Sequence, residues 1–187
     1  MTGKYIRMGR LFEADHETSV MVAISNSMYF GPTAGLETIN EVRGVIQACV
    51  DGGCDAIMIT PGALRANIDL LSGRNKPAIV LSAGYTNAWR PTDNLGRGGH
   101  GGDQALFASV EEAVRLGADA FHIYAFLGWQ DDAHEVREIE RLGRVCEEAR
   151  KWGMPVLCEP LARGDAVSPD EFSSLENVAL MARLASE

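Results

Sequence analysis

Gly53-Cys-Asp-Ala-Ile-Met-Ile-Thr60 and Gly117-Ala-Asp-Ala-Phe-His-Ile-Tyr124 are near copies of one segment, and this segment decides the fold. Apolar residues at helical spacing precede each copy, over Leu36 to Val50 and over Val110 to Leu116, and the glycine ends the helix that they predict. The rest of each copy is a short apolar run, which is typical of a strand covered on both faces. A helix that ends at glycine and leads into such a strand predicts an α/β protein.

The same pattern continues along the chain. A third helix is predicted from Ala133 to Trp152, with Gly153 after it and a strand over Met154 to Glu159. Parallel neighbours need a covering crossover, so we expect about five parallel strands with covering helices in a single domain over residues 1–187. The remaining predicted strands are Val20 to Ser25 and Pro77 to Ser82, and capping patterns predict helix starts at Ser109 with Glu112 and at Ser168 with Pro169 and Glu171.

The composition argues against several classes of partner. A formal charge of −9 opposes binding to phosphate backbones, which depends on many Lys and Arg contacts, so we expect no nucleic acid partner. The apolar runs are strand-sized, far below the roughly 20 residues that cross a bilayer, and the first residues lack the apolar stretch of a secretory signal. We therefore expect no membrane association and a cytoplasmic location.

Cysteine and histidine spacing gives no sign of a metal centre. Neither residue type pairs at the separations that zinc sites use, so we expect reduced thiols, no metal and no cofactor. The cysteines are Cys49, Cys54, Cys146 and Cys158, and the histidines are His16, His100, His122 and His134.

Two architectures accommodate five strand–helix units. An open doubly wound sheet would be complete at this length, whereas a closed barrel needs eight strands and usually about 250 residues. Length by itself favours the open sheet. Gly96-Arg-Gly-Gly-His-Gly101 matches the dinucleotide-binding pattern as a string, but polar residues precede it and a predicted strand, Asp103 to Ala108, follows it. That context is wrong for a nucleotide site, and we interpret the glycines as a loop over the mouth of a barrel.

Six blocks of the sequence, taken in order, favour the barrel. Together they resemble the class I (Schiff-base) aldolases, in the superfamily of the archaeal-type fructose-bisphosphate aldolases and the deoxyribose-phosphate aldolases. The resemblance implies a partial TIM (β/α)8 barrel, namely its first five of eight units. The blocks are Met8 to Phe12, Phe30 to Glu37, Asp51 to Ala56, Val80 to Gly84, Ser109 to Ala120 and Trp152 to Leu157, with Arg163-Gly164 just beyond.

The resemblance directs attention to the carboxyl ends of the strands, where barrel enzymes carry their chemistry. Alternation places Glu159 inward on the fifth strand, where it could act as the catalytic acid or base or pair with Arg163 for structural reasons. His122 could equally be a hydrogen-bonded core residue, and Ser25 and Asn26 could cap a strand end. The residues expected to bind substrate are Ser25, Asn26, Thr60, His122, Tyr124 and Arg163.

The same resemblance exposes two departures from the family pattern. The tyrosine acid/base of the family falls on Leu161. The imine-forming lysine of the family lies on the sixth strand, and this sequence ends at Glu187, before that strand would begin. Its lysines, Lys4 in the amino-terminal tail, Lys76 and Lys151, are predicted on the opposite face.

Three hypotheses follow. The first is a class I aldolase-like carbon–carbon lyase for a small phosphorylated sugar or aldehyde, inactive as this chain because the Lys-bearing strand is missing. The second is a non-catalytic partial barrel that serves as a binding or assembly subunit; its two bare sheet edges would favour a homo-oligomer. The third is an open sheet that binds a ligand where its strand order reverses.

Overall fold

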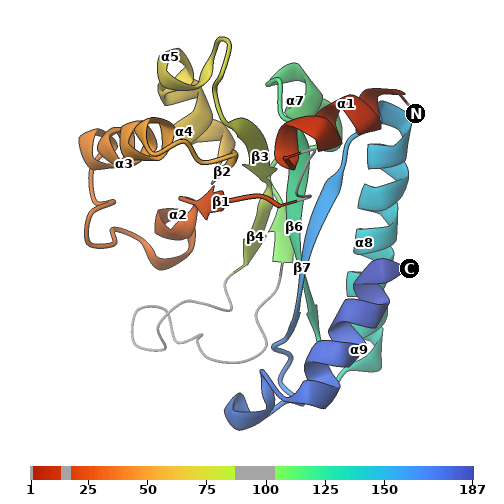
Figure 1. Ribbon diagram of the computed structural model, residues 1–187. Helices are drawn as coiled ribbons and strands as arrows, with labels where there is room; N and C mark the ends of the chain where they lie inside the picture. Colours follow the sequence, from red (N-terminus) through yellow and green to blue (C-terminus); the bar gives the residue numbers. More distant parts are fainter. Residues whose placement is uncertain (1, 14–17, 87–103) are drawn as a thin grey trace.

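The computed structural model describes residues 2–13, 18–86 and 104–187, and it contains a curled sheet of five parallel strands (Figure 1). The strand order β1-β2-β3-β6-β7 follows the chain without reversal, which is the order of a barrel and not of a doubly wound sheet. The expectation of about five parallel strands is confirmed. The strands are β1 (Met21–Ala23), β2 (Ala56–Ile59), β3 (Ala78–Ser82), β6 (Ala120–Leu127) and β7 (Val156–Ala162).

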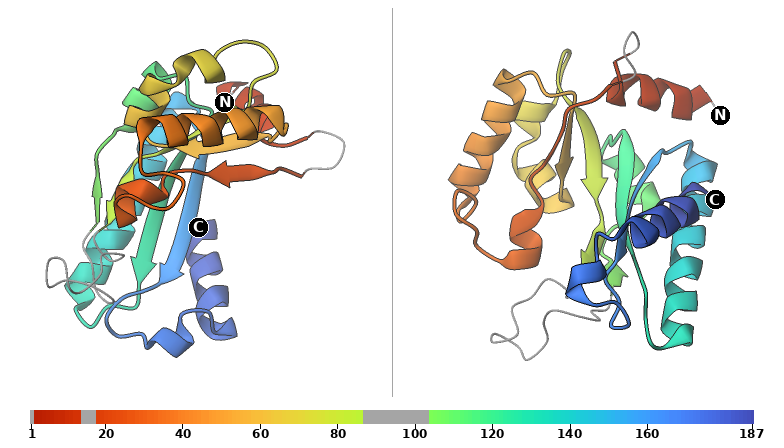
Figure 2. Two further views of the ribbon diagram at one scale, coloured as in Figure 1. Left: turned by 90° about the vertical axis from the view of Figure 1, so that its left-hand side faces the viewer. Right: turned by 60° about the horizontal axis from the view of Figure 1, so that its bottom comes forward.

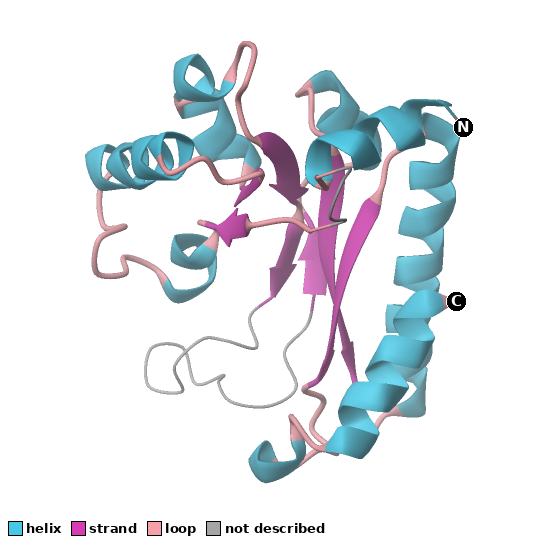
Figure 3. Ribbon diagram, in the orientation of Figure 1, coloured by secondary structure: helices cyan, strands magenta, loops and turns pink. Residues whose placement is uncertain are grey.

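Helices cover the outer side of this curve (Figures 1 and 3). The outward residues of the strands, such as Ile57, Leu81 and Phe121, form the main core with the apolar stripes of the helices. The last helix, α9 (Leu175–Ser186), lies beside β7 (Figure 2). The other covering helices are α3 (Ile39–Asp51), α4 (Pro61–Ala66), α5 (Ile68–Leu71), α7 (Val110–Arg115) and α8 (Asp132–Trp152).

Three helices end in the same way, which confirms the repeat seen in the sequence. A glycine with positive φ follows each of them: Gly53 at 71°, Gly117 at 75° and Gly153 at 58°. The amide after that glycine bonds back to a carbonyl five residues earlier, and this pattern turns the chain directly into the next strand. These bonds are Cys54 N to Cys49 O at 3.3 Å, Ala118 N to Ala113 O at 2.9 Å and Met154 N to Ala149 O at 2.9 Å.

The amino end of the half-barrel interior is apolar and is closed by helix α1 (Thr2–Leu11). Leu11, 3% exposed, packs against the inward residues Met58 and Val80. Arg10 donates to the carboxylate of Asp119 at 2.8 Å, which ties the helix to the start of β6. The prediction that Lys4 lies in an amino-terminal tail is therefore wrong, because residues 2–11 form a packed helix.

Two further elements differ from the predictions. The strand predicted from Asp103 to Ala108 contributes β5 (Gln104–Leu106), which pairs antiparallel with β4 (Gly84–Thr86) and not with the main sheet. The capping pattern at Ser168 begins a short 3-10 helix, η1 (Pro169–Glu171), whereas α9 starts after Ser174, whose hydroxyl accepts from Asn177 N at 3.3 Å. The predicted loop Gly96 to Gly101 and His16 lie outside the described residues.

None of the described helices combines the length and the apolar composition that a membrane span requires.

Candidate functional site

Polar side chains gather inside the curve, from the carboxyl end of β3 across the middle of β6 and β7. The strand register pairs Ser82 with His122 and Tyr124 with Glu159, so these four residues occupy inward positions on neighbouring strands. The same strands carry Ala78, Val80 and Ala120 at their amino ends. The interior therefore changes from apolar to polar along the strands.

The buried part of this cluster is a hydrogen-bonded row that starts at helix α2 (Asn26–Phe30). The hydroxyl of Tyr29 donates to the carbonyl oxygen of Gly84 at 2.9 Å and lies 3.2 Å from Ser82 Oγ. Ser82 Oγ lies 3.3 Å from Nδ1 of His122. Because the Tyr29 proton is directed at Gly84, the Ser82 hydroxyl can donate to Nδ1; in that arrangement a neutral imidazole carries its proton on Nε2.

His122 connects this row to solvent through Glu159. Its Nε2 lies 3.3 Å from Glu159 Oε2, but the two groups are not aligned for a hydrogen bond, and Nε2 has no hydrogen-bond partner among the described residues. The His122 side chain is 0% exposed, whereas 47% of the Glu159 side chain is exposed. An accessible carboxylate thus lies next to a buried imidazole.

Tyr124 packs against the row and shares its environment. Its ring centroid lies 4.8 Å from that of His122 and 5.6 Å from that of Tyr29, both in edge-to-face geometry. Burial, and secondarily the Glu159 carboxylate, raise the pKa of Tyr124 above that of an ordinary tyrosine. Burial also raises the pKa of Tyr29, although its hydrogen bond with Ser82 acts in the opposite direction. Both hydroxyls are therefore protonated at neutral pH and can donate hydrogen bonds.

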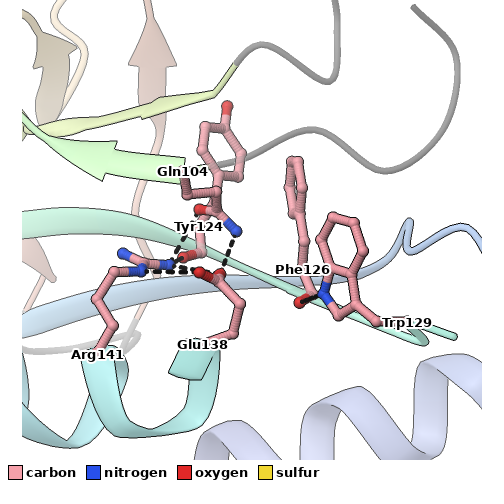
Figure 4. A network of polar contacts seen from close by, with 6 residues as sticks. All are labelled: Gln104, Tyr124, Phe126, Trp129, Glu138 and Arg141. Atoms are coloured by element: carbon pink, nitrogen blue, oxygen red, sulfur yellow. Dashed lines mark hydrogen bonds and ion pairs between the residues drawn. The ribbon is translucent and has the colours of Figure 1, made fainter. Parts of the chain in front are cut away.

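A polar network behind β6 holds this strand in place (Figure 4). Arg141 Nη2 donates to the carbonyl oxygen of Tyr124 at 2.7 Å and to Glu138 Oε2 at 3.0 Å, and Gln104 Nε2 donates to the same carboxylate at 2.5 Å. Figure 4 shows the rings of Tyr124 and Phe126 on the face of β6 that is turned away from these groups. Glu138 and Arg141 on α8 therefore position the strand, and the rings of Tyr124 and Phe126 point into the site.

The loops after β6 and β7 are joined at the rim of the site. Gly164 N donates to Leu127 O at 2.9 Å, and Gln130 N donates to Asp165 Oδ1 at 2.8 Å. A Cβ atom on Gly164 would lie 2.1 Å from the carbonyl oxygen of Gly128, so only glycine fits there. Trp129 reinforces the loop by donating from Nε1 to Phe126 O at 2.8 Å.

The structure brings together some of the predicted site residues and separates others. His122, Tyr124 and Glu159 form one cluster, and the buried Ser25 lies beside Tyr29, whose pKa its hydroxyl lowers by hydrogen bonding. Asn26 is the exposed first residue of α2.

Two other predicted residues make structural contacts. Thr60 accepts from Ala63 N at 3.3 Å and caps α4. The guanidinium of Arg163 lies over the ring of Phe172 at 4.2 Å.

Sequence reasoning missed two members of the row, Ser82 and Tyr29. Ser82 ends a predicted strand, and alternation from Val80 already places it inward, so the signal was present. Tyr29 comes from a short helix after β1, and nothing in its sequence neighbourhood predicts that it folds back over β3.

The described residues hold no cluster of three or more His, Cys, Asp or Glu side chains that could bind a metal ion. A hollow of about 480 Å³ lies on the outer side between α7 and α8, away from the cluster, with Val110, Phe121 and Arg141 among its lining. A second hollow, about 450 Å³, lies between the Gly31–Val42 segment and α4. Lys4 in α1, Lys76 before β3 and Lys151 in the last turn of α8 all lie at the amino ends of the strands.

A curved parallel sheet whose strand order follows the chain, with covering helices outside, is the architecture of the (β/α)8-barrel class. Within that class, a model of the DeoC/LacD family aldolases matches residues 14–187, and the chain belongs to this family. The resemblance stated from the sequence is confirmed.

Individual relatives agree with this assignment. The chain is 29% identical over 187 residues to an uncharacterized aldolase of Saccharolobus solfataricus, covering 65% of that protein. It is 25% identical over 173 residues to a 3-hydroxy-5-phosphonooxypentane-2,4-dione thiolase of Yersinia pseudotuberculosis, covering 53% of it. The fold matches the crystal structure of an archaeal fructose 1,6-bisphosphate aldolase with a TM-score of 0.75 at 22% identity, over 97% of this chain and 66% of that one. The chain thus spans between half and two thirds of these relatives, and its five parallel strands form a curled half-barrel as expected.

Proposed function

We propose that this chain supplies the acid–base and substrate-lining part of a class I aldolase-type site, which cleaves or forms a carbon–carbon bond in a small phosphorylated sugar or aldehyde. The observation that carries the proposal is the row from exposed Glu159 through buried His122 to Ser82 and Tyr29. Such a row at the carboxyl ends of barrel strands combines an accessible proton acceptor with a buried group that orients it.

Each residue of the cluster has a role in this proposal. Glu159 takes the proton from the hydroxyl group on one of the two carbons whose bond is cleaved, and it returns a proton to the product. His122, held by Ser82, places its Nε2 3.3 Å from Glu159 Oε2 and orients the carboxylate. Tyr124 donates a hydrogen bond to a substrate oxygen, because its raised pKa keeps the hydroxyl protonated. Ser25, Asn26, Thr60 and Arg163 remain proposed contacts for the outer part of the substrate.

The nucleophile has to come from elsewhere. Aldolases of class I form an imine through a lysine whose pKa is lowered by its surroundings. The three lysines of this sequence, Lys4, Lys76 and Lys151, lie at the amino ends of the strands and cannot reach the cluster. We infer that these 187 residues form no imine by themselves and are inactive until another polypeptide segment or subunit supplies the lysine.

Borohydride trapping tests the missing nucleophile. The chain is incubated with dihydroxyacetone phosphate, reduced with borohydride and measured by intact-protein mass spectrometry. We expect the mass to stay unchanged. A covalent adduct on any of the three lysines would contradict the inference.

Binding tests the substrate class. We expect dihydroxyacetone phosphate to bind the chain in isothermal titration calorimetry, and Tyr124→Phe to weaken binding by about fivefold, since one hydrogen bond contributes about 1 kcal/mol. Tyr5→Phe, which changes an exposed tyrosine of α1, is the matched control and should bind as the wild type does. No binding by the wild type, or equal losses in both variants, would reject the proposed site.

A second candidate function, a non-catalytic assembly subunit, is supported by the edges of the sheet. β1 and β7 each pair on one side within the described sheet, and α9 exposes Leu175, Val178 and Leu180. Bare edges and apolar patches are normally covered by a partner. Size exclusion with light scattering distinguishes the cases: an oligomer favours assembly, and a stable monomer at high concentration counts against it.

A further inference from the structure

The junction between α3 and β2 places two cysteines against each other. Gly53 N donates to Val50 O at 3.2 Å and Cys54 N donates to Cys49 O at 3.3 Å, while Gly53 has a φ of 71°. This pair of bonds is the Schellman arrangement at a helix end, in which the side chains at the first and last positions frequently pack against each other. In this junction those two side chains are the thiols of Cys49 and Cys54.

The other two junctions show what the geometry does with ordinary residues. The equivalent positions hold Ala113 with Ala118 after α7, and Ala149 with Met154 after α8. All four side chains are buried in the main core. The backbone therefore brings these positions together in each repeat, and of the three junctions it is the one after α3 that carries two thiols.

The two thiols are reduced and close enough to interact. Both cysteines are free and partly buried, and both pack against the main core. Burial, and secondarily the neighbouring Cys49 thiol, raise the pKa of the Cys54 thiol. A disulfide requires Cβ atoms about 4 Å apart, which is the separation of side chains in direct contact.

We propose that Cys49 and Cys54 form an oxidisable dithiol, a modification site at which an oxidant of the glutathione-disulfide class forms a reversible intramolecular disulfide. One protein thiolate attacks a sulfur of oxidised glutathione, and a mixed disulfide forms as one glutathione thiolate leaves. The second protein thiolate attacks the protein sulfur of that bond and releases the second glutathione. In total two protein thiols lose two protons and two electrons, and one glutathione disulfide becomes two glutathione molecules.

The resulting bond would fasten the last turn of α3 to the residue that leads into β2. This junction lies at the amino end of the sheet, so the modification acts on the frame of the half-barrel and not on the Glu159 cluster. The inference is independent of the proposed lyase function.

The test counts thiols on the native chain. The protein is treated with oxidised glutathione at about pH 8.5, because burial raises the pKa of the Cys54 thiol and the thiolate is the reacting form. Free thiols are then blocked with iodoacetamide and counted by mass. We expect the number of alkylated cysteines to fall from four to two, the peptide that contains both Cys49 and Cys54 to lose two hydrogen atoms, and dithiothreitol to restore four.

Two variants provide the controls. Cys146→Ala removes a cysteine of α8, and in this variant the peptide with Cys49 and Cys54 should still lose two hydrogen atoms on oxidation. Cys49→Ala should abolish this loss of two hydrogen atoms, and Cys54 should then be either free or in a mixed disulfide with glutathione. Four alkylated cysteines in the oxidised wild type, a stable glutathione adduct on it, or a bond that involves Cys146 or Cys158 would each overturn the proposal.

Discussion

The two ends of the half-barrel interior are built on the same strands and carry opposite chemistry. On β3, Ala78 and Val80 face inward at the amino end and Ser82 follows at the carboxyl end. On β6, Ala120 is followed by His122. At the amino end, α1 covers the interior with apolar side chains, whereas at the carboxyl end the fold buries hydroxyls and an imidazole whose Nε2 has no hydrogen-bond partner among the described residues. The apolar end therefore stabilises the fold, whereas the polar end buries polar groups at some loss of stability.

The largest expected effect comes from the apolar end. Leu11→Ala removes the residue that anchors α1 and leaves a cavity beside Met58 and Val80, so the free energy of unfolding should fall by about 3 kcal/mol. Urea denaturation measures this loss. Tyr5→Ala, on the exposed side of the same helix, should change stability by less than about 0.5 kcal/mol. Similar values for the two variants would mean that α1 does not close the barrel.

The next effect concerns the buried row at the polar end. Ser82→Ala leaves Nδ1 of His122 without a partner, which should cost about 1.5 kcal/mol. Adding His122→Leu removes the orphaned imidazole, so the double variant should recover most of that stability. Urea denaturation of the wild type, the two single variants and the double variant gives the coupling free energy between Ser82 and His122. Additive losses would show that His122 contributes packing and not a polar interaction with Ser82.

A smaller effect is expected at the solvent-facing member of the cluster. Glu159→Gln should change the free energy of unfolding by less than about 0.5 kcal/mol, because the side chain is half exposed and solvent screens its charge. Glu147→Gln on the surface of α8 is the matched control. A loss near that of Leu11→Ala would assign Glu159 to the stability of the fold.

The smallest effect is a pH dependence at the apolar end. Burial raises the pKa of Asp119 and outweighs both the amide of Ile79 and the nearby Arg10, which act to lower it. A raised carboxyl pKa stabilises the fold below the ordinary aspartate value and loses that contribution as pH rises through the raised value. The stability of the wild type relative to Asp119→Asn should therefore fall as pH rises from about 3.9. Urea denaturation of the two proteins at increasing pH measures this difference in the free energy of unfolding. If the wild type instead gained stability relative to Asp119→Asn as pH rises, the interaction with Arg10 would outweigh burial.

Much of this comparison could be predicted from the sequence, because it depends on local pattern. Glycine after an apolar stripe located the ends of α3, α7 and α8, and two-residue alternation placed His122, Tyr124 and Glu159 on one face. The remaining features depend on contacts between distant segments. The cap that Thr60 provides to α4 was not predicted, and Tyr29 reaches Ser82 across 53 positions of the chain.

The close approach of Gly164 to the carbonyl of Gly128 has a practical meaning for protein engineering. The loops after β6 and β7 contact each other closely, so a loop taken from a related enzyme would fit only if the neighbouring loop were replaced together with it. Libraries that aim to change the reactivity of this rim should therefore randomise the two loops as one cassette and keep both glycines fixed.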